Sequence, residues 1–175
     1  MSDIVDFSVL YNMIKNNYPL LDFKKKINSI DLFLPNHDRE IPCVEIFHTI
    51  VSTDRPEYMT ILLEAMTFEE KNKMVEIYNN TADRIRANLQ EEYESAFHEE
   101  RLMMADCIRK ELKCEPTKEF IIDRFFDFSE PVIDYLTKNH MDVLSAPEIK
   151  TAITEKIKKC NYFLERFTAA PPNFD

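Results

Sequence analysis

Glycine is absent from all 175 residues of this chain, although average usage would place about a dozen glycines there. Only glycine takes positive φ angles freely and lets a phosphate or another backbone approach without a Cβ atom in between. The absence therefore excludes the P-loop, the dinucleotide-binding G-x-G-x-x-G motif, the kinase phosphate loop, the G-x-S-x-G nucleophile elbow and the EF-hand calcium loop. Common nucleotide-binding and hydrolase frameworks are thus disfavoured, whereas a helical enzyme whose site is assembled from distant side chains remains an alternative.

The chain is acidic, with 22 Lys and Arg residues against 32 Asp and Glu residues and a net charge of -10. A charge of this sign repels nucleic-acid phosphates at long range. The basic candidates are residues 24–26 and a set on the last predicted helix, namely Lys156, Lys158, Lys159 and Arg166. That helix also carries three glutamates, so its lysine and arginine side chains are expected to belong to a solvated face. Nucleic-acid binding is therefore kept only as the less favoured alternative.

The cysteine pattern and the hydropathy indicate the cellular compartment in which the protein is expected. Four cysteines lie far apart in the chain, which is typical of reduced thiols in an intracellular protein; they are Cys43, Cys107, Cys114 and Cys160. No apolar run approaches the roughly 20 residues of a membrane span, and the first residues lack the charged-then-apolar pattern of a leader. We expect an intracellular protein, cytoplasmic or nuclear, without membrane contact.

Hydrophobic periodicity and capping signals predict helices along most of the chain. Capping boxes are expected at Asp54 with Glu57, at Thr67 with Glu70 and at Ser145 with Glu148. The last of these begins a helix with one apolar stripe, which consists of Ile149, Ile153, Ile157, Cys160, Leu164 and Phe167. We expect an all-α fold, a compact bundle of about six to eight helices, in a single domain over residues 1–168 with an extended tail over residues 169–175. Residues 30–44 leave open a short β-hairpin, but a helix that begins at Pro42 is favoured.

Residues 68–113 keep a helical pattern over a long stretch. An unbroken helix of that span would be about 70 Å long, whereas a compact domain of this size has a diameter of about 40 Å. Poor helix formers at residues 79–81 and a charged interruption at residues 98–101 offer two break points. We favour breaks inside the domain, and the alternative is a projecting helix that forms a homodimer through residues 68–113.

The residue patterns that could form a metal site or a catalytic site are weak. Glu45 and His48 have the Glu-x-x-His spacing of di-iron bundles, but no second copy of the motif exists. Six residues lie between Cys107 and Cys114, rather than the two between the cysteines of a zinc knuckle. The side chains of Cys43 and His48 would point in different directions whether the segment is a helix or a strand. We therefore expect no catalytic residue, no metal and no cofactor.

Aromatic and methionine residues are the positive signal. Phe126 and Phe128 belong to an apolar run that surrounds most of a helix, and Met103 with Met104 could line either a core or an adaptable groove. The sequence predicts a non-catalytic interaction module, an adaptor or a regulatory protein, that binds a partner protein through apolar side chains. The candidate partner-binding residues are Phe126, Phe128, Met103, Met104, Phe97 and Leu89.

The segment Thr67-Phe-Glu-Glu-Lys-Asn72 is similar to a helix of the phosphopeptide-binding 14-3-3 proteins, and the similarity continues through Tyr78 and Asn80 to Arg84 and Arg86. The similarity covers less than an eighth of the chain. Members of that family are longer, and the arginine and tyrosine that hold the phosphate later in their sequence have no counterpart here. The resemblance therefore adds neither a fold nor a ligand to the analysis.

Overall fold

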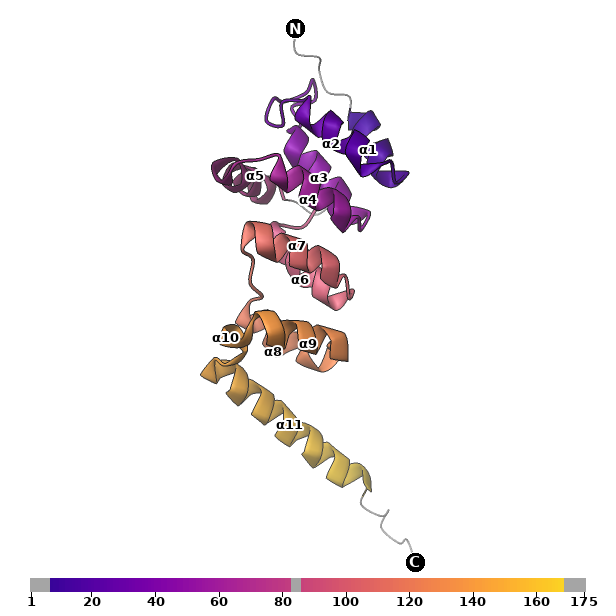
Figure 1. Cartoon of the computed structure of the whole chain (residues 1–175). Helices are drawn as coiled ribbons and strands as arrows, with labels where there is room; N and C mark the ends of the chain where they lie inside the picture. Colours follow the sequence, from indigo (N-terminus) through magenta and orange to yellow (C-terminus); the bar gives the residue numbers. More distant parts are fainter. Residues whose placement is uncertain (1–6, 83–85, 169–175) are drawn as a thin grey trace, which may run out of the picture. The chain divides into compact units, whose positions relative to one another are not determined.

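The computed structural model describes residues 7–82 and 86–168, and these residues are all helix and loop. They form eleven α-helices and one short 3-10 helix, with no strand among them (Figure 1). The all-α prediction is confirmed. The helices are shorter and more numerous than the six to eight expected, because prolines and capping residues start new helices after short turns. The tail predicted at residues 169–175 lies outside the described residues.

Internal contacts divide the chain into two compact units, Met1–Glu115 and Pro116–Asp175. The first unit contains seven α-helices among its described residues, and the second contains four with the 3-10 helix. The single domain expected over residues 1–168 stays a prediction.

The first unit is built around the pair of helices α3 and α4, which a short turn joins. Helix α1 packs on α3, α2 packs on α4, and α7 packs on the same α4 helix. Helix α5 contacts α3, while α6 pairs with α7. The bounds are α1 (Phe7–Lys15), α2 (Leu20–Asn28), α3 (Pro42–Ser52), α4 (Pro56–Glu64), α5 (Phe68–Asn80), α6 (Leu89–His98) and α7 (Leu102–Leu112).

Buried aromatic pairs fix how these helices meet. The rings of Phe23 and Tyr58 lie 4.8 Å apart in a T-shaped arrangement, and those of Phe47 and Tyr78 lie 4.9 Å apart in the same way. The Tyr58 hydroxyl donates a hydrogen bond of 2.5 Å to the backbone carbonyl of Tyr18. Edge-to-face pairs of this kind add directional energy to area burial, so the first unit has a defined core.

The helices begin and break at some of the predicted residues and not at others. The capping box of Thr67 and Glu70 is present, whereas α4 begins at Pro56 with Arg55 as N-cap and no side-chain cap. The box expected at Asp54 and Glu57 is therefore wrong, because proline at the first helical position sets the start instead. Both breaks in residues 68–113 are confirmed, since α5 ends at Asn80 and α6 ends at His98.

The loop before α3 contains no strand, so the hairpin considered for residues 30–44 does not form. The Asn36 side-chain oxygen instead accepts hydrogen bonds of 2.9 Å from the backbone amides of Asp38 and Glu40. Such an Asx turn satisfies the backbone locally. The favoured alternative, a helix that begins at Pro42, is confirmed.

The second unit begins after Glu115 and ends in the longest helix. Helix α11 packs on α8, and α10 packs on α9. Its core is small and holds Ile121, Val132, Leu136 and Ile149, each at most 2% exposed. The bounds are α8 (Lys118–Arg124), η1 (Phe125–Asp127), α9 (Glu130–Asn139), α10 (Met141–Leu144) and α11 (Pro147–Thr168).

Candidate functional site

The predicted partner-binding residues of the first unit lie in contrasting environments. Leu89, Phe97 and Met104 belong to its core, with 5%, 0% and 0% of their surfaces exposed. Met103, beside Met104 on α7, is 74% exposed. Of these four side chains, only Met103 is available to a partner without unfolding the unit. The homodimer through residues 68–113 stays a prediction, and it would have to use exposed side chains such as Met103 and Phe68.

Phe126 and Phe128 belong to an aromatic cluster of the second unit. The Phe128 ring is partly buried and lies 5.7 Å from that of Phe120. Phe126 is 57% exposed and its ring lies 4.1 Å from that of Phe125. The Lys156 ammonium of α11 stands 5.2 Å from the centre of the Phe125 ring. Phe126 is thus the solvent-facing end of a cluster that anchors α11 to η1.

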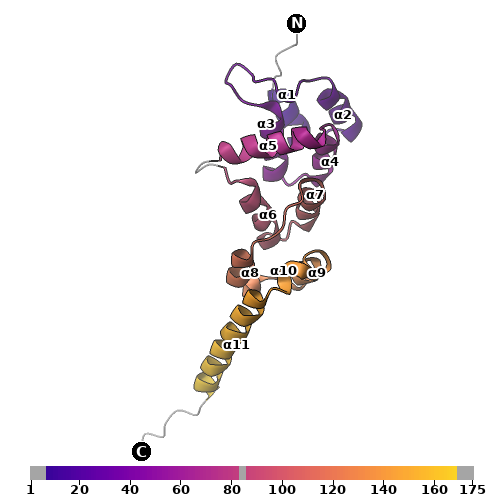
Figure 2. The same ribbon diagram turned by 90° about the vertical axis from the view of Figure 1, so that its left-hand side faces the viewer.

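The largest set of uncovered apolar side chains lies on α11. The stripe expected from the sequence begins with Ile149, which is 1% exposed, and continues through Ile153, which is half-buried. Beyond that point coverage is lost: Ile157 is 45%, Leu164 61% and Phe167 83% exposed. Figure 2 shows the C-terminal half of α11 extending beyond α8, α9 and α10. One face of this helix is therefore core at its start and open surface at its end.

The open part of the stripe is a continuous face, which we call the α11 face. Residues three and four apart share a helix face, and its members, Ile157, Cys160, Phe163, Leu164 and Phe167, follow that spacing. Every residue from 157 to 168 is exposed. The sequence pattern predicted the stripe but not its exposure, because periodicity is the same whether or not a neighbour covers it. The signal for exposure was length, since 22 residues span about 33 Å.

Positive charge borders one edge of the α11 face, where Lys159 and Arg166 lie four residues before and three residues after Phe163. Residues 157–168 contain Lys158, Lys159 and Arg166 against the single carboxylate of Glu165, a net charge of +2. This contrasts with the net charge of -10 on the whole chain. The Arg166 guanidinium donates a 2.7 Å hydrogen bond to the Tyr162 hydroxyl and lies 5.1 Å from its ring centre. The face thus combines an apolar strip with a basic border.

The thiols of the first unit lack the character of nucleophiles. Burial raises the pKa of Cys43 to about 12 and that of Cys114 to about 11, and it also raises the pKa of Cys107. A catalytic thiol needs a lowered pKa to be present as the thiolate. In the part of the chain that the structure describes, no group of three or more His, Cys, Asp or Glu side chains could hold a metal ion.

Across residues 7–82 and 86–168, no helix is both long and apolar enough to cross a bilayer. Comparison of the chain with protein-family models, with curated proteins and with solved structures gave no match. The function must therefore be argued from the geometry of the chain itself.

Proposed function

We propose that this protein is a non-catalytic interaction module that lays the α11 face into an apolar groove of a partner protein. The observation that carries the proposal is the open half of α11, where Ile157, Leu164 and Phe167 remain 45%, 61% and 83% exposed. Anchors at positions 157, 160, 164 and 167 have the spacing of helix-in-groove recognition. Covering each large side chain contributes about 1 kcal/mol or more.

The charge around the α11 face indicates the kind of groove it fits. Lys159 and Arg166 lie four residues before and three residues after Phe163, at one edge of the face, so a groove with an acidic rim is complementary and a basic one is repelled. The 12-residue segment is about 18 Å long, which matches one short groove rather than a flat surface. An exposed free thiol at Cys160 suits a reducing, intracellular compartment.

Cys160 provides a probe at the centre of the α11 face. A photo-activated benzophenone attached to Cys160 of the full chain should form a covalent adduct with the partner in a lysate of the source cells. The control chain carries the same probe at Lys158→Cys in a Cys160→Ser background, on the opposite side of the same helix. Mass spectrometry of the adducts should identify a partner peptide that is crosslinked from position 160 and not from position 158.

A second pair of variants tests the side chains themselves. Phe163→Asp should reduce the adduct yield by about tenfold or more, because it places a carboxylate in the groove. Tyr162→Asp is the matched control, since Tyr162 is 54% and Phe163 59% exposed on different faces of one helix. Both variants should keep the helical circular dichroism of the parent. Equal adducts from positions 158 and 160, or equal loss in both variants, would refute the assignment of the face.

A further inference from the structure

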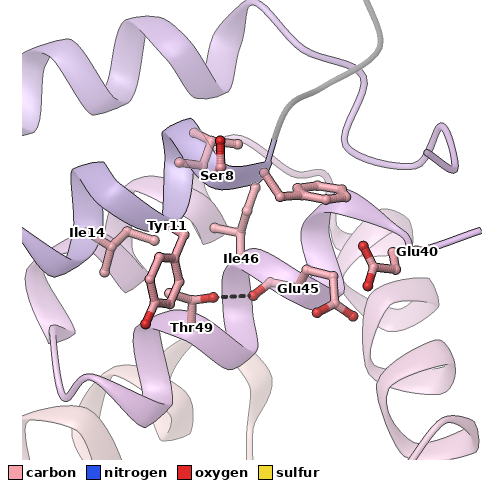
Figure 3. A pocket seen from close by; sticks show the side chains of 9 residues that line it. Ser8, Tyr11, Ile14, Glu40, Glu45, Ile46 and Thr49 are labelled. Atoms are coloured by element: carbon pink, nitrogen blue, oxygen red, sulfur yellow. Dashed lines mark hydrogen bonds between the residues drawn. The ribbon is translucent and has the colours of Figure 1, made fainter. Parts of the chain in front are cut away.

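A pocket of about 290 Å³ opens between α1 and α3 in the first unit. Its walls differ in character, as Figure 3 shows. Ile14 and Ile46 lie beneath its floor and are buried, and the accessible apolar lining comes from the half-exposed ring of Tyr11 and the partly exposed Phe7. Glu40 and Glu45 place their carboxylates at the other end. The pocket is thus an apolar slot with a negatively charged end.

The Glu45 carboxylate is held there at an energetic cost. Burial raises the pKa of Glu45, and the nearby charge of Glu40 raises it further, against smaller opposing effects of His48 and Arg86. Among the described residues, no hydrogen bond or ion pair reaches the Glu45 carboxylate. The Glu40 carboxylate accepts one hydrogen bond of 2.9 Å from Asn36. A cation between the two carboxylates would relieve their repulsion.

The size of the pocket limits the ligand. Small-molecule sites usually occupy roughly 300–1,000 Å³, so 290 Å³ suits one long side chain better than a nucleotide or a cofactor. Lysine and arginine combine an apolar stem with a charged end, and an aromatic ring such as that of Tyr11 attracts a cation as well. A neutral or anionic ligand would cover the Glu45 carboxylate without pairing its charge.

We propose that this pocket binds the side chain of a lysine or arginine of another polypeptide, with the charged group between Glu40 and Glu45 and the stem against the ring of Tyr11. The site lies on α1, α3 and the loop before α3 in the first unit, and it uses no residue of α11. Binding at this pocket can therefore be tested independently of the α11 face. It would give the protein a second contact that selects for positive charge.

The test titrates the ¹⁵N-labelled full chain with N-acetyl-lysine-N-methylamide and follows the amide resonances. Saturable shifts in residues 8–14 and 40–49 are expected, with a dissociation constant of about 1 mM, as is usual for a single side chain. The norleucine analogue, which keeps the stem but lacks the ammonium, should give no saturable shift. Titration with n-butylamine distinguishes a free amine from a peptide side chain, since the peptide probe adds contacts of its own backbone at the mouth.

Two variants assign the contacts. Glu45→Gln and Glu40→Gln should each weaken the lysine probe by about fivefold, the effect of one partly solvated charge. Glu57→Gln, an exposed glutamate of α4, is the control with the same change of charge and should leave binding unaltered. Glu40 is exposed, so its variant folds even where the Glu45 variant is perturbed. Absence of shifts, equal binding of norleucine, stronger binding of butylamine than of the lysine probe, or equal weakening by Glu57→Gln would overturn the proposal.

Discussion

At the scale of single residues, the chain makes without glycine the backbone shapes for which glycine is normally used. Within residues 7–82 and 86–168, five non-glycine residues have φ between 51° and 64°, and each ends a helix or turns a loop: Asn17, Arg39, Asp54, Glu100 and Lys113. A left-handed conformation costs a residue with a Cβ atom roughly 1–2 kcal/mol. The absence of glycine thus removes phosphate loops as expected, but it does not remove left-handed turns.

Glu100→Gly should stabilise the protein. Glu100 has φ of 56° in the turn between α6 and α7 and is exposed, so glycine relieves backbone strain there. The gain is partly offset by the greater freedom of glycine in the unfolded chain, which leaves about 0.5–1 kcal/mol. Urea denaturation measures it. The control Glu76→Gly, in the middle of α5, should instead lose about 1 kcal/mol. Destabilisation by Glu100→Gly would show that its conformation is not strained.

At the scale of elements, local sequence determined where helices begin and packing determined which of them are held in place. Thr67 accepts a hydrogen bond from the Glu70 amide at 3.2 Å, and Asn88 accepts one from Glu91 at 2.9 Å. These caps are formed by residues three apart, so short-range spacing is enough to predict them. Helix α11 differs, because its pattern is continuous while its neighbours cover only its first half.

Amide exchange should divide α11 into two parts. Residues 149–156 pack on α8, whereas residues 157–168 contact no described residue closely enough to be buried. An isolated segment of 12 residues is a marginal helix in water, so its amides should exchange at least about tenfold faster than those of the first half. Hydrogen–deuterium exchange mass spectrometry measures the difference. Uniform protection along α11 would mean that another molecule, such as a second copy, already covers the α11 face.

At the scale of the whole molecule, the two units have separate cores of unequal size. Among the described residues of the second unit, the buried aliphatic set consists of four side chains, including Leu136 and Ile149, while the first unit buries several aromatic rings as well. A unit of about 60 residues with so small a core is marginal by itself. The first unit should therefore be the more stable of the two.

Calorimetry should show two unfolding transitions, with the second unit melting first. Leu136→Ala removes a side chain that is 2% exposed from the core of the second unit and should cost about 2–5 kcal/mol. It should lower the first transition and leave the second in place. Leu62→Ala, in the core of the first unit, is the complementary variant. A single transition that both variants shift equally would support the single domain predicted over residues 1–168.

Much of the helical content follows from the sequence because helices, caps and breaks are set by residues within one or two turns of one another. The breaks near Asn80 and His98 and the start at Pro42 are of this kind. Positions whose role depends on a distant neighbour could not be predicted in this way. Leu89 and Phe97 share the helical pattern of Phe163 and Phe167, yet the first pair is buried and the second is exposed.

The sequence by itself determined that the chain is helical, acidic and without glycine-based ligand loops, since each of these depends on composition or on short-range spacing. Only the tertiary structure decided which apolar stripes are core and which are surface, because burial requires a second element to arrive from elsewhere in the chain. The pocket between α1 and α3 likewise depends on the tertiary structure. Tyr11 and Glu45 are 34 positions apart in sequence, and they line one pocket only because α1 packs on α3.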